Sequence, residues 1–199
     1  MTPDEIARSY DQIADQWNSD AFPRTNGIEQ HDRAVEFVKQ RRHALDIGCG
    51  SSGRIIDHMI SHGFDAEGLD VSHRMIELAR KRHPGITFSH ADITNWRFSK
   101  KYDFISAWDS VWHLSLADQE AVLKKIMRGL TDGGVFIFTT GGLNGPEEKV
   151  DSAMGPPMYY SVLGISRTLE IISDNQCVCR HLEYDQYPEL HLYVIAQRI

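Results

Sequence analysis

The sequence predicts an α/β protein in which helices cover both faces of a mostly parallel sheet of seven strands, with an antiparallel hairpin at its C-terminal end. Short apolar runs alternate with stretches of helical periodicity through residues 44–140, as in parallel sheets built from strand–helix–strand units. A glycine-rich turn, 48–53, joins the first strand to a helix. Only Tyr187 to Leu190 separates the last two apolar runs, which is too short for a parallel crossover. Together these observations indicate a Rossmann-like architecture.

The first third of the chain predicts three helices and one strand. Residues Pro3–Trp17 and Ile28–Gln40 carry apolar side chains at helical spacing, and the loop over 21–27 between them contains proline and glycine. Strand 44–47 leads through the glycine turn into a third helix, whose buried face is expected over 55–60.

The alternation continues through the middle of the chain. Further strands are expected at Phe64–Asp70, Ile86–His90, Tyr102–Trp108 and Val135–Thr140. A capping box that begins at Ser115 precedes the long helix before the last of these strands.

The C-terminal part is less regular. Residues 141–160 are rich in glycine and proline without a clear period, which predicts a long loop, and such loops are usually functional or mobile. A helix over Val162–Asn175 and two strands, Cys177–Gln186 and His191–Arg198, should complete the fold.

Length and composition favour one domain spanning residues 1–199, of which 41% are apolar. Three cysteines, without a histidine partner at metal-site spacing, are expected to be buried thiols rather than zinc ligands. Residues 1–17 lack the apolar core of a secretion signal, and no apolar run reaches the roughly 20 residues of a membrane span. We therefore expect a cytoplasmic protein that does not enter a membrane.

The formal charge of −7 argues against binding to nucleic-acid backbones, which requires concentrated Lys and Arg. The basic clusters lie near the ends of predicted helices, where solvated helix surface explains them. A small-molecule partner is the better expectation.

The glycine turn carries the main functional signal. Gly48, Gly50 and Gly53 match the G-x-G-x-x-G pattern of dinucleotide sites, and glycine allows a ligand to approach the main chain closely. Asp46, however, would repel a pyrophosphate and attract a ligand amino group. Asp70, at the end of the next strand, can accept hydrogen bonds from both hydroxyls of a ribose.

These residues resemble motif I and the ribose acid of the class I S-adenosylmethionine-dependent methyltransferases, in the small single-domain form. Ser52 departs from the motif, because it stands where the third glycine is usual. The resemblance implies S-adenosyl-L-methionine as cofactor, S-adenosyl-L-homocysteine as product and methyl transfer to a small-molecule acceptor. Residues 1–30 resemble the family's N-terminal lid helix and loop, although ordinary core packing explains the same helical spacing equally well.

The resemblance also implies a set of cofactor contacts. In the family, an acid after the third strand accepts from the adenine amino group and its apolar neighbour packs on the ring, a pattern that Asp92 and Ile93 fit. A polar turn would also explain this aspartate. The contacts expected with the cofactor come from Tyr10, Asp46, Gly48, Gly50, Asp70, Val71, Met75, Asp92, Ile93 and Trp108.

The loop over 109–114 should open over the reacting methyl. His113 is the best candidate for a general base, because histidine titrates near neutral pH, and Asp109 is placed to orient His113 or the acceptor. A histidine that only packs or shapes the pocket explains the position at least as well, and His31 is one of several rivals. The side chains expected around the substrate, partly from the loop over 141–160, are Trp17, Trp112, Tyr159, Tyr160 and His191.

The alternative is a nucleotide-binding protein without methyl transfer, either an NAD-type oxidoreductase or a cofactor-binding regulator. The predicted terminal hairpin argues against it, since a dinucleotide fold would continue with another helix and a parallel strand. The loop at 109–112 also lacks the Asn/Asp-Pro-Pro-Tyr/Phe pattern of many enzymes that methylate nucleic-acid bases.

Overall fold

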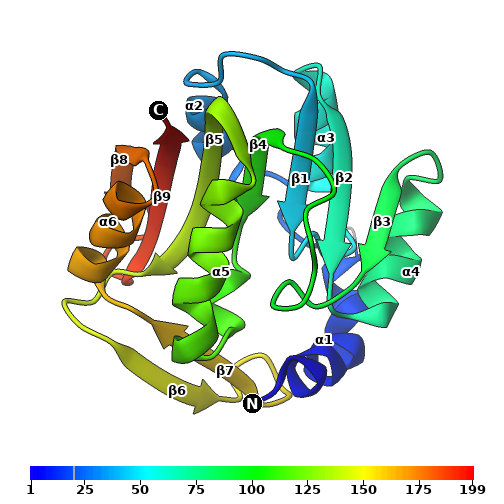
Figure 1. Cartoon of the computed structure of the whole chain (residues 1–199). Helices are drawn as coiled ribbons and strands as arrows, with labels where there is room; N and C mark the ends of the chain where they lie inside the picture. Colours follow the sequence, from blue (N-terminus) through cyan, green and yellow to red (C-terminus); the bar gives the residue numbers. More distant parts are fainter. Residues whose placement is uncertain (20) are drawn as a thin grey trace.

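The computed structural model describes residues 1–19 and 21–199. Its main sheet has seven strands in the order β3-β2-β1-β4-β5-β9-β8 (Figure 1). The strands are β1 (His43–Ile47), β2 (Asp65–Asp70), β3 (Thr87–His90), β4 (Tyr102–Ala107), β5 (Leu130–Gly141), β8 (Cys177–Tyr184) and β9 (His191–Arg198). The first five run parallel, and β9 pairs antiparallel with both β5 and β8. The predicted fold class and its terminal hairpin are therefore confirmed.

Helices cover both faces of this sheet. They are α1 (Pro3–Trp17), α2 (Ile28–Val35), α3 (Arg54–Ser61), α4 (His73–Arg82), α5 (Leu116–Arg128) and α6 (Ile165–Asp174), with a short 3₁₀ helix, η1 (Val111–His113). The buried sides of α2, α3 and α4 share one core cluster with the sheet, and those of α5 and α6 share another. Since helices cover both faces of the sheet, every residue of β4 is buried, including the polar Asp103 and Ser106.

Local signals fix the ends of several helices. Thr2 and Glu5 form a reciprocal capping box at the start of α1, where Pro3 occupies the first turn. Ser115 caps α5 as its motif predicts, accepting a hydrogen bond from the Asp118 amide. Gly63 follows α3 with a φ of +88°, the left-handed conformation of a helix end.

Three expectations about element boundaries are wrong. The segment 141–160 contains strand β6 (Glu147–Asp151), which pairs antiparallel with β7 (Met158–Val162). Its exposed charged residues hide the alternation from which strands are predicted. Helix α2 stops at Val35 rather than continuing to residue 40, and the Phe37 carbonyl accepts from Gln197 instead of continuing the helix. Strand β5 begins at Leu130 rather than at the expected Val135.

Helix α1 and the β6–β7 hairpin lie at the edge of the sheet where the parallel strands end (Figure 1). On one side of α1, Asp11 accepts hydrogen bonds from Ser72 Oγ (2.5 Å) and the Arg74 amide (3.1 Å) at the start of α4. On the other side, Ser9 Oγ donates to the Pro157 carbonyl at 2.7 Å. Helix α1 is therefore held across the carboxyl ends of the strands.

Within the described ranges, the helices are too short or too polar to cross a bilayer.

Candidate functional site

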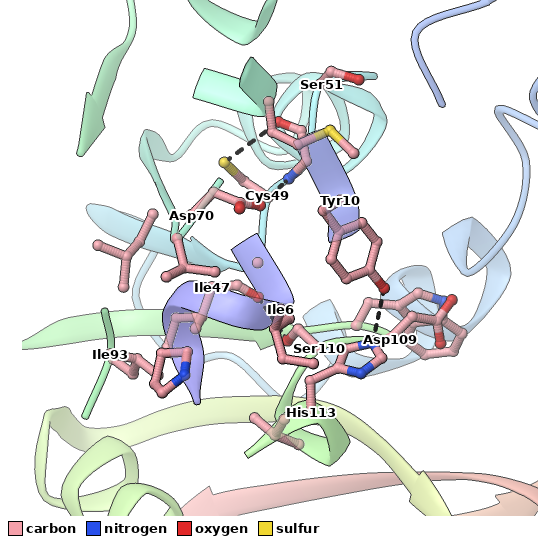
Figure 2. Close-up of a pocket in the computed structure, with 18 of the residues that line it drawn as sticks. Ile6, Tyr10, Ile47, Cys49, Ser51, Asp70, Ile93, Asp109, Ser110 and His113 are labelled. Atoms are coloured by element: carbon pink, nitrogen blue, oxygen red, sulfur yellow. Dashed lines mark hydrogen bonds between the residues drawn. The ribbon is translucent and has the colours of Figure 1, made fainter. Parts of the chain in front are cut away.

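A pocket opens at the carboxyl ends of β1, β2 and β4, beneath α1. It encloses about 1030 Å³, open mouth included, at the upper end of the size range of small-molecule sites. Nine of the ten residues expected at the cofactor line it: Tyr10, Gly48, Gly50, Asp70, Val71, Met75, Asp92, Ile93 and Trp108. Figure 2 shows Asp70 and Ile93 at the left of the pocket and Tyr10, Asp109 and His113 at the right.

The glycine turn presents its main chain to the pocket at one position in particular. Gly48 and Gly50 both adopt positive φ, +72° and +58°. A Cβ on Gly48 would lie 2.3 Å from the Ser110 Cβ, whereas one on Gly50 would meet nothing within 4 Å. A side chain at Gly48 would therefore disturb the fold, and only Gly50 keeps free space for a ligand.

The Asp70 carboxylate joins the glycine turn to the end of β2. Its two oxygens accept hydrogen bonds from the amides of Gly50 and Ser72, each at 2.8 Å. Burial raises the pKa of this carboxyl, and the two amide bonds oppose that rise. Because a carboxylate has about four acceptor positions, Asp70 can still receive hydroxyl donors from a ligand in the pocket.

Asp92 lies at the pocket wall after β3. Its carboxylate accepts from the Thr94 amide at 2.8 Å and from Asn95 Nδ2 at 3.1 Å. The polar-turn explanation of this aspartate therefore holds, while its neighbour Ile93 supplies an apolar surface to the same pocket.

Asp46 is the exception among the expected cofactor residues. Its side chain is 3% exposed and does not line the pocket. Burial raises its pKa to about 7, while nearby Arg54 and Ser106 lower it. Arg54 does reach the pocket, and it donates to the Asn26 carbonyl (2.9 Å) and to Ser52 Oγ (3.2 Å). Asp46 thus lies beneath the turn, where its charge acts on Arg54.

His113 lines the pocket as a neutral side chain. Its Nδ1 lies 2.7 Å from the Tyr159 carbonyl, which can only accept, so Nδ1 carries the proton. The Nε2 atom then accepts from the Tyr10 hydroxyl (2.7 Å) and from Trp112 Nε1 (3.2 Å). Burial lowers the pKa of His113 to about 4. Both nitrogens are occupied, so this geometry favours a positioning role for His113 over proton transfer.

Asp109 lines the pocket, and a hydrogen bond from His191 orients its carboxylate. Its Oδ1 accepts from His191 Nε2 at 3.0 Å, and His191 Nδ1 lies 2.5 Å from Asp185 Oδ1. An imidazole between two carboxylates must donate from both nitrogens. Although burial lowers the pKa of His191, these carboxylates raise it overall. Asp109 has a φ of +54°, and such strain in a non-glycine residue is frequent at functional sites.

The expected substrate residues divide into two groups. Trp17 lines the pocket and packs on Phe22, with ring centroids 4.6 Å apart. The remaining four, Trp112, Tyr159, Tyr160 and His191, do not line it. The Tyr159 hydroxyl donates to Glu148 within the hairpin, and the Tyr160 ring packs 5.0 Å from that of His113.

His31, a rival for the base, lies in the core instead. Its nitrogens lie 2.6 Å from the Gly27 carbonyl and 2.9 Å from Ser106 Oγ, and burial lowers its pKa to about 3.

Several pocket residues are not among the contacts expected from the sequence, although Cys49, Ser51 and Ser110 belong to the glycine turn or to the loop over 109–114. Ile6, Cys49, Ser51 and Ser110 line the pocket and are labelled in Figure 2. Ile6 belongs to an apolar helical stripe that packing alone explains, and Ser110 follows a strand without any motif. Arg54 comes one residue after the glycine turn, and only this position in the sequence indicates that it reaches the pocket.

Comparisons with known proteins agree with this geometry. A family model described as "Methyltransferase domain" matches residues 44–134. Trans-aconitate 2-methyltransferase of Rhizobium etli is 37% identical over 102 residues, covering 50% of this chain and 38% of that protein. The dTDP-3-amino-3,6-dideoxy-alpha-D-glucopyranose N,N-dimethyltransferase of Streptomyces fradiae is 25% identical over 142 residues, covering 67% of this chain and 52% of that protein. The chain thus spans only part of these relatives.

Among solved structures, the chain is similar to the S-adenosylmethionine-bound CalS10, an amino pentose methyltransferase from Micromonospora echinaspora. The TM-score is 0.67, with 16% identity over 90% of this chain and 93% of that one. At this identity the likeness concerns the fold.

A pair of glycine variants tests where the ligand lies. Gly50→Ala and Gly63→Ala each place a Cβ in open space at positive φ, so each should cost about 1 kcal/mol of folding stability. Of these two glycines, only Gly50 lines the pocket. Titration with S-adenosylhomocysteine should show an affinity reduced at least about tenfold, or ~1.4 kcal/mol, in Gly50→Ala and unchanged in Gly63→Ala. Equal affinities in the two variants would contradict this placement.

Proposed function

We propose that the chain is a class I S-adenosylmethionine-dependent methyltransferase, which transfers a methyl group from S-adenosylmethionine to a small-molecule acceptor; the matched methyltransferase domain and the relatives support this. The observation that carries this proposal is the open main chain at Gly50, beside Asp70, in a pocket that continues to Asp109. We further propose that residues 1–199 act as one domain. A cytoplasmic location stays a prediction.

The residues of the pocket fit this cofactor. Asp70 would receive the ribose hydroxyls, Ile93 and Val71 would enclose the adenine, and the turn at Gly50 would receive the methionine part. When bound, the cofactor supplies a methyl group on a positively charged sulfur. The protein's task is then to bind the acceptor in line with that methyl group and to exclude water. Helix α1, with Tyr10 and Trp17 over the pocket, serves the second task.

The charges around the pocket favour an amine as the acceptor. Among the described residues that line it, three are acidic, Asp70, Asp92 and Asp109, and one is basic, Arg54. Arg54 donates to the uncharged Asn26 carbonyl and Ser52 hydroxyl, so it keeps its positive charge. A polycarboxylate would meet three carboxylates and one guanidinium, whereas an ammonium group would gain a carboxylate partner.

The names of the relatives include both kinds of substrate. The Rhizobium etli relative is named for trans-aconitate, and the Streptomyces fradiae relative is named as an N,N-dimethyltransferase of an amino sugar. The carboxylate of Asp109 favours the second kind for this chain.

Asp109 is the residue that we assign to the acceptor. His191 Nε2 contacts one carboxylate oxygen of Asp109 and fixes the orientation of that carboxylate. Asp185 contacts the other ring nitrogen of His191. The second oxygen remains for a donor on the acceptor nitrogen. An acceptor ammonium would first give one proton to Asp109 or to water, because only the neutral amine has a lone pair. That lone pair would form the new bond to the methyl carbon as the bond from carbon to sulfur broke, leaving the electron pair on sulfur and the positive charge on the methylated nitrogen.

In this scheme His113 is a positioning residue. It accepts from the Tyr10 hydroxyl at 2.7 Å and so fixes that side chain over the pocket. Burial raises the pKa of Tyr10, so the phenol stays protonated near neutral pH and acts as a donor.

An NAD-type oxidoreductase is not favoured. The sheet ends in the antiparallel pair β8–β9 rather than in a further parallel unit.

Methyl transfer from labelled S-adenosylmethionine should be measured across matched small molecules that carry an amine, a hydroxyl or a carboxylate. We expect transfer to amines to be fastest. Preferred transfer to carboxylates would contradict the assigned acceptor, and a lack of transfer to every compound in a broad panel would argue against the proposed activity.

Asp109→Asn should separate acceptor binding from cofactor binding. The loss of a charge-assisted hydrogen bond of about 1.5–3 kcal/mol should lower kcat/KM for the amine roughly tenfold to a hundredfold. Affinity for S-adenosylhomocysteine should stay within about threefold of wild type, a change of less than ~0.7 kcal/mol. Wild-type kcat/KM in this variant would exclude Asp109 from acceptor binding.

A further inference from the structure

Three possible metal ligands meet between α2 and α3, outside the pocket. Asp32 comes from α2, and His58 lies on α3. His62 is the C-cap residue of α3, one turn after His58, so both imidazoles face the same side of that helix. Asp32 Oδ1 lies 2.8 Å from His58 Nε2 and 3.6 Å from His62 Nε2. One ligand atom from each of the three residues lies within 4.8 Å of the others.

The hydrogen bonds of His62 leave a lone pair facing this group. Its Nδ1 lies 3.0 Å from the His58 carbonyl, which can only accept, so Nδ1 carries a proton. In neutral His62 the bare Nε2 then faces the Asp32 carboxylate. A lone pair and a carboxylate that face each other at this distance can both bind a metal ion placed between them.

The types of the ligands select a class of metal. Two imidazole nitrogens and one carboxylate oxygen suit Zn²⁺, Co²⁺, Ni²⁺ or Cu²⁺ better than Mg²⁺ or Ca²⁺, which prefer oxygen alone. Around tetrahedral Zn²⁺, with bonds of about 2.0–2.1 Å, ligand atoms lie roughly 3.4 Å apart. Small movements of the exposed side chains reach this spacing.

The burial of the three residues allows such movement and leaves one side open. The side chain of His58 is 5% exposed and fixed, whereas those of Asp32 and His62 are 56% and 28% exposed. Water can therefore take the fourth position. We propose that Asp32, His58 and His62 bind one Zn²⁺ or a similar borderline divalent ion, which links α2 to the helix that follows the glycine turn.

Titration of the untagged, chelator-treated full chain with Zn²⁺ alone tests this proposal. Wild type should bind one Zn²⁺, and each of His62→Gln and Asp32→Asn should weaken binding at least about tenfold through loss of a ligand. His73→Gln, at an exposed histidine on α4 near Glu77, is the matched control and should bind as wild type does. Zn²⁺ should raise the Tm of wild type and of this control only.

Each alternative result would overturn the proposal. These results are wild type that binds no Zn²⁺, ligand variants that bind it as tightly as wild type, or Mg²⁺ binding as tight as that of Zn²⁺. Because Asp32 is exposed and His62 is partly exposed, the metal-free variants should unfold near the wild-type Tm, and either variant alone is sufficient for the comparison.

Discussion

The site depends on the Asp70 carboxylate, which is bound by two main-chain amides at the carboxyl edge of the sheet. Parallel pairing of β1 with β2 brings the glycine turn beside the end of β2, and there Asp70 accepts from Gly50 and Ser72. A buried carboxylate without these donors would be costly. The same contacts hold Gly50 in the conformation that leaves its main chain open to a ligand.

Two further hydrogen-bond networks attach α1, η1, β7 and β9 to this edge of the sheet. The Tyr10 hydroxyl, the His113 ring and the Tyr159 carbonyl connect α1, η1 and β7 across the pocket. Behind the pocket, His191 on β9 holds Asp109. The terminal hairpin therefore contributes directly to the site, because β9 carries the histidine that orients Asp109.

The sequence predicted the sheet, and nine of the ten expected cofactor residues line one pocket, because glycine turns and strand-end acids are local patterns. Their contacts with the cofactor stay a prediction. It did not predict the β6–β7 hairpin, whose first strand is exposed and charged, so no apolar alternation marks it. It also missed that Asp46 lies beneath the turn and that a Cβ on Gly48 would strike Ser110. These facts depend on which way a side chain points in the packed fold, and one-dimensional spacing does not determine that direction.

A pocket built for S-adenosylmethionine should discriminate against a dinucleotide. Calorimetric titration of the wild-type chain with S-adenosylhomocysteine and, separately, with NAD measures this preference. We expect S-adenosylhomocysteine to bind at least about tenfold more tightly, a difference of ~1.4 kcal/mol. Preferential binding of NAD would contradict the account.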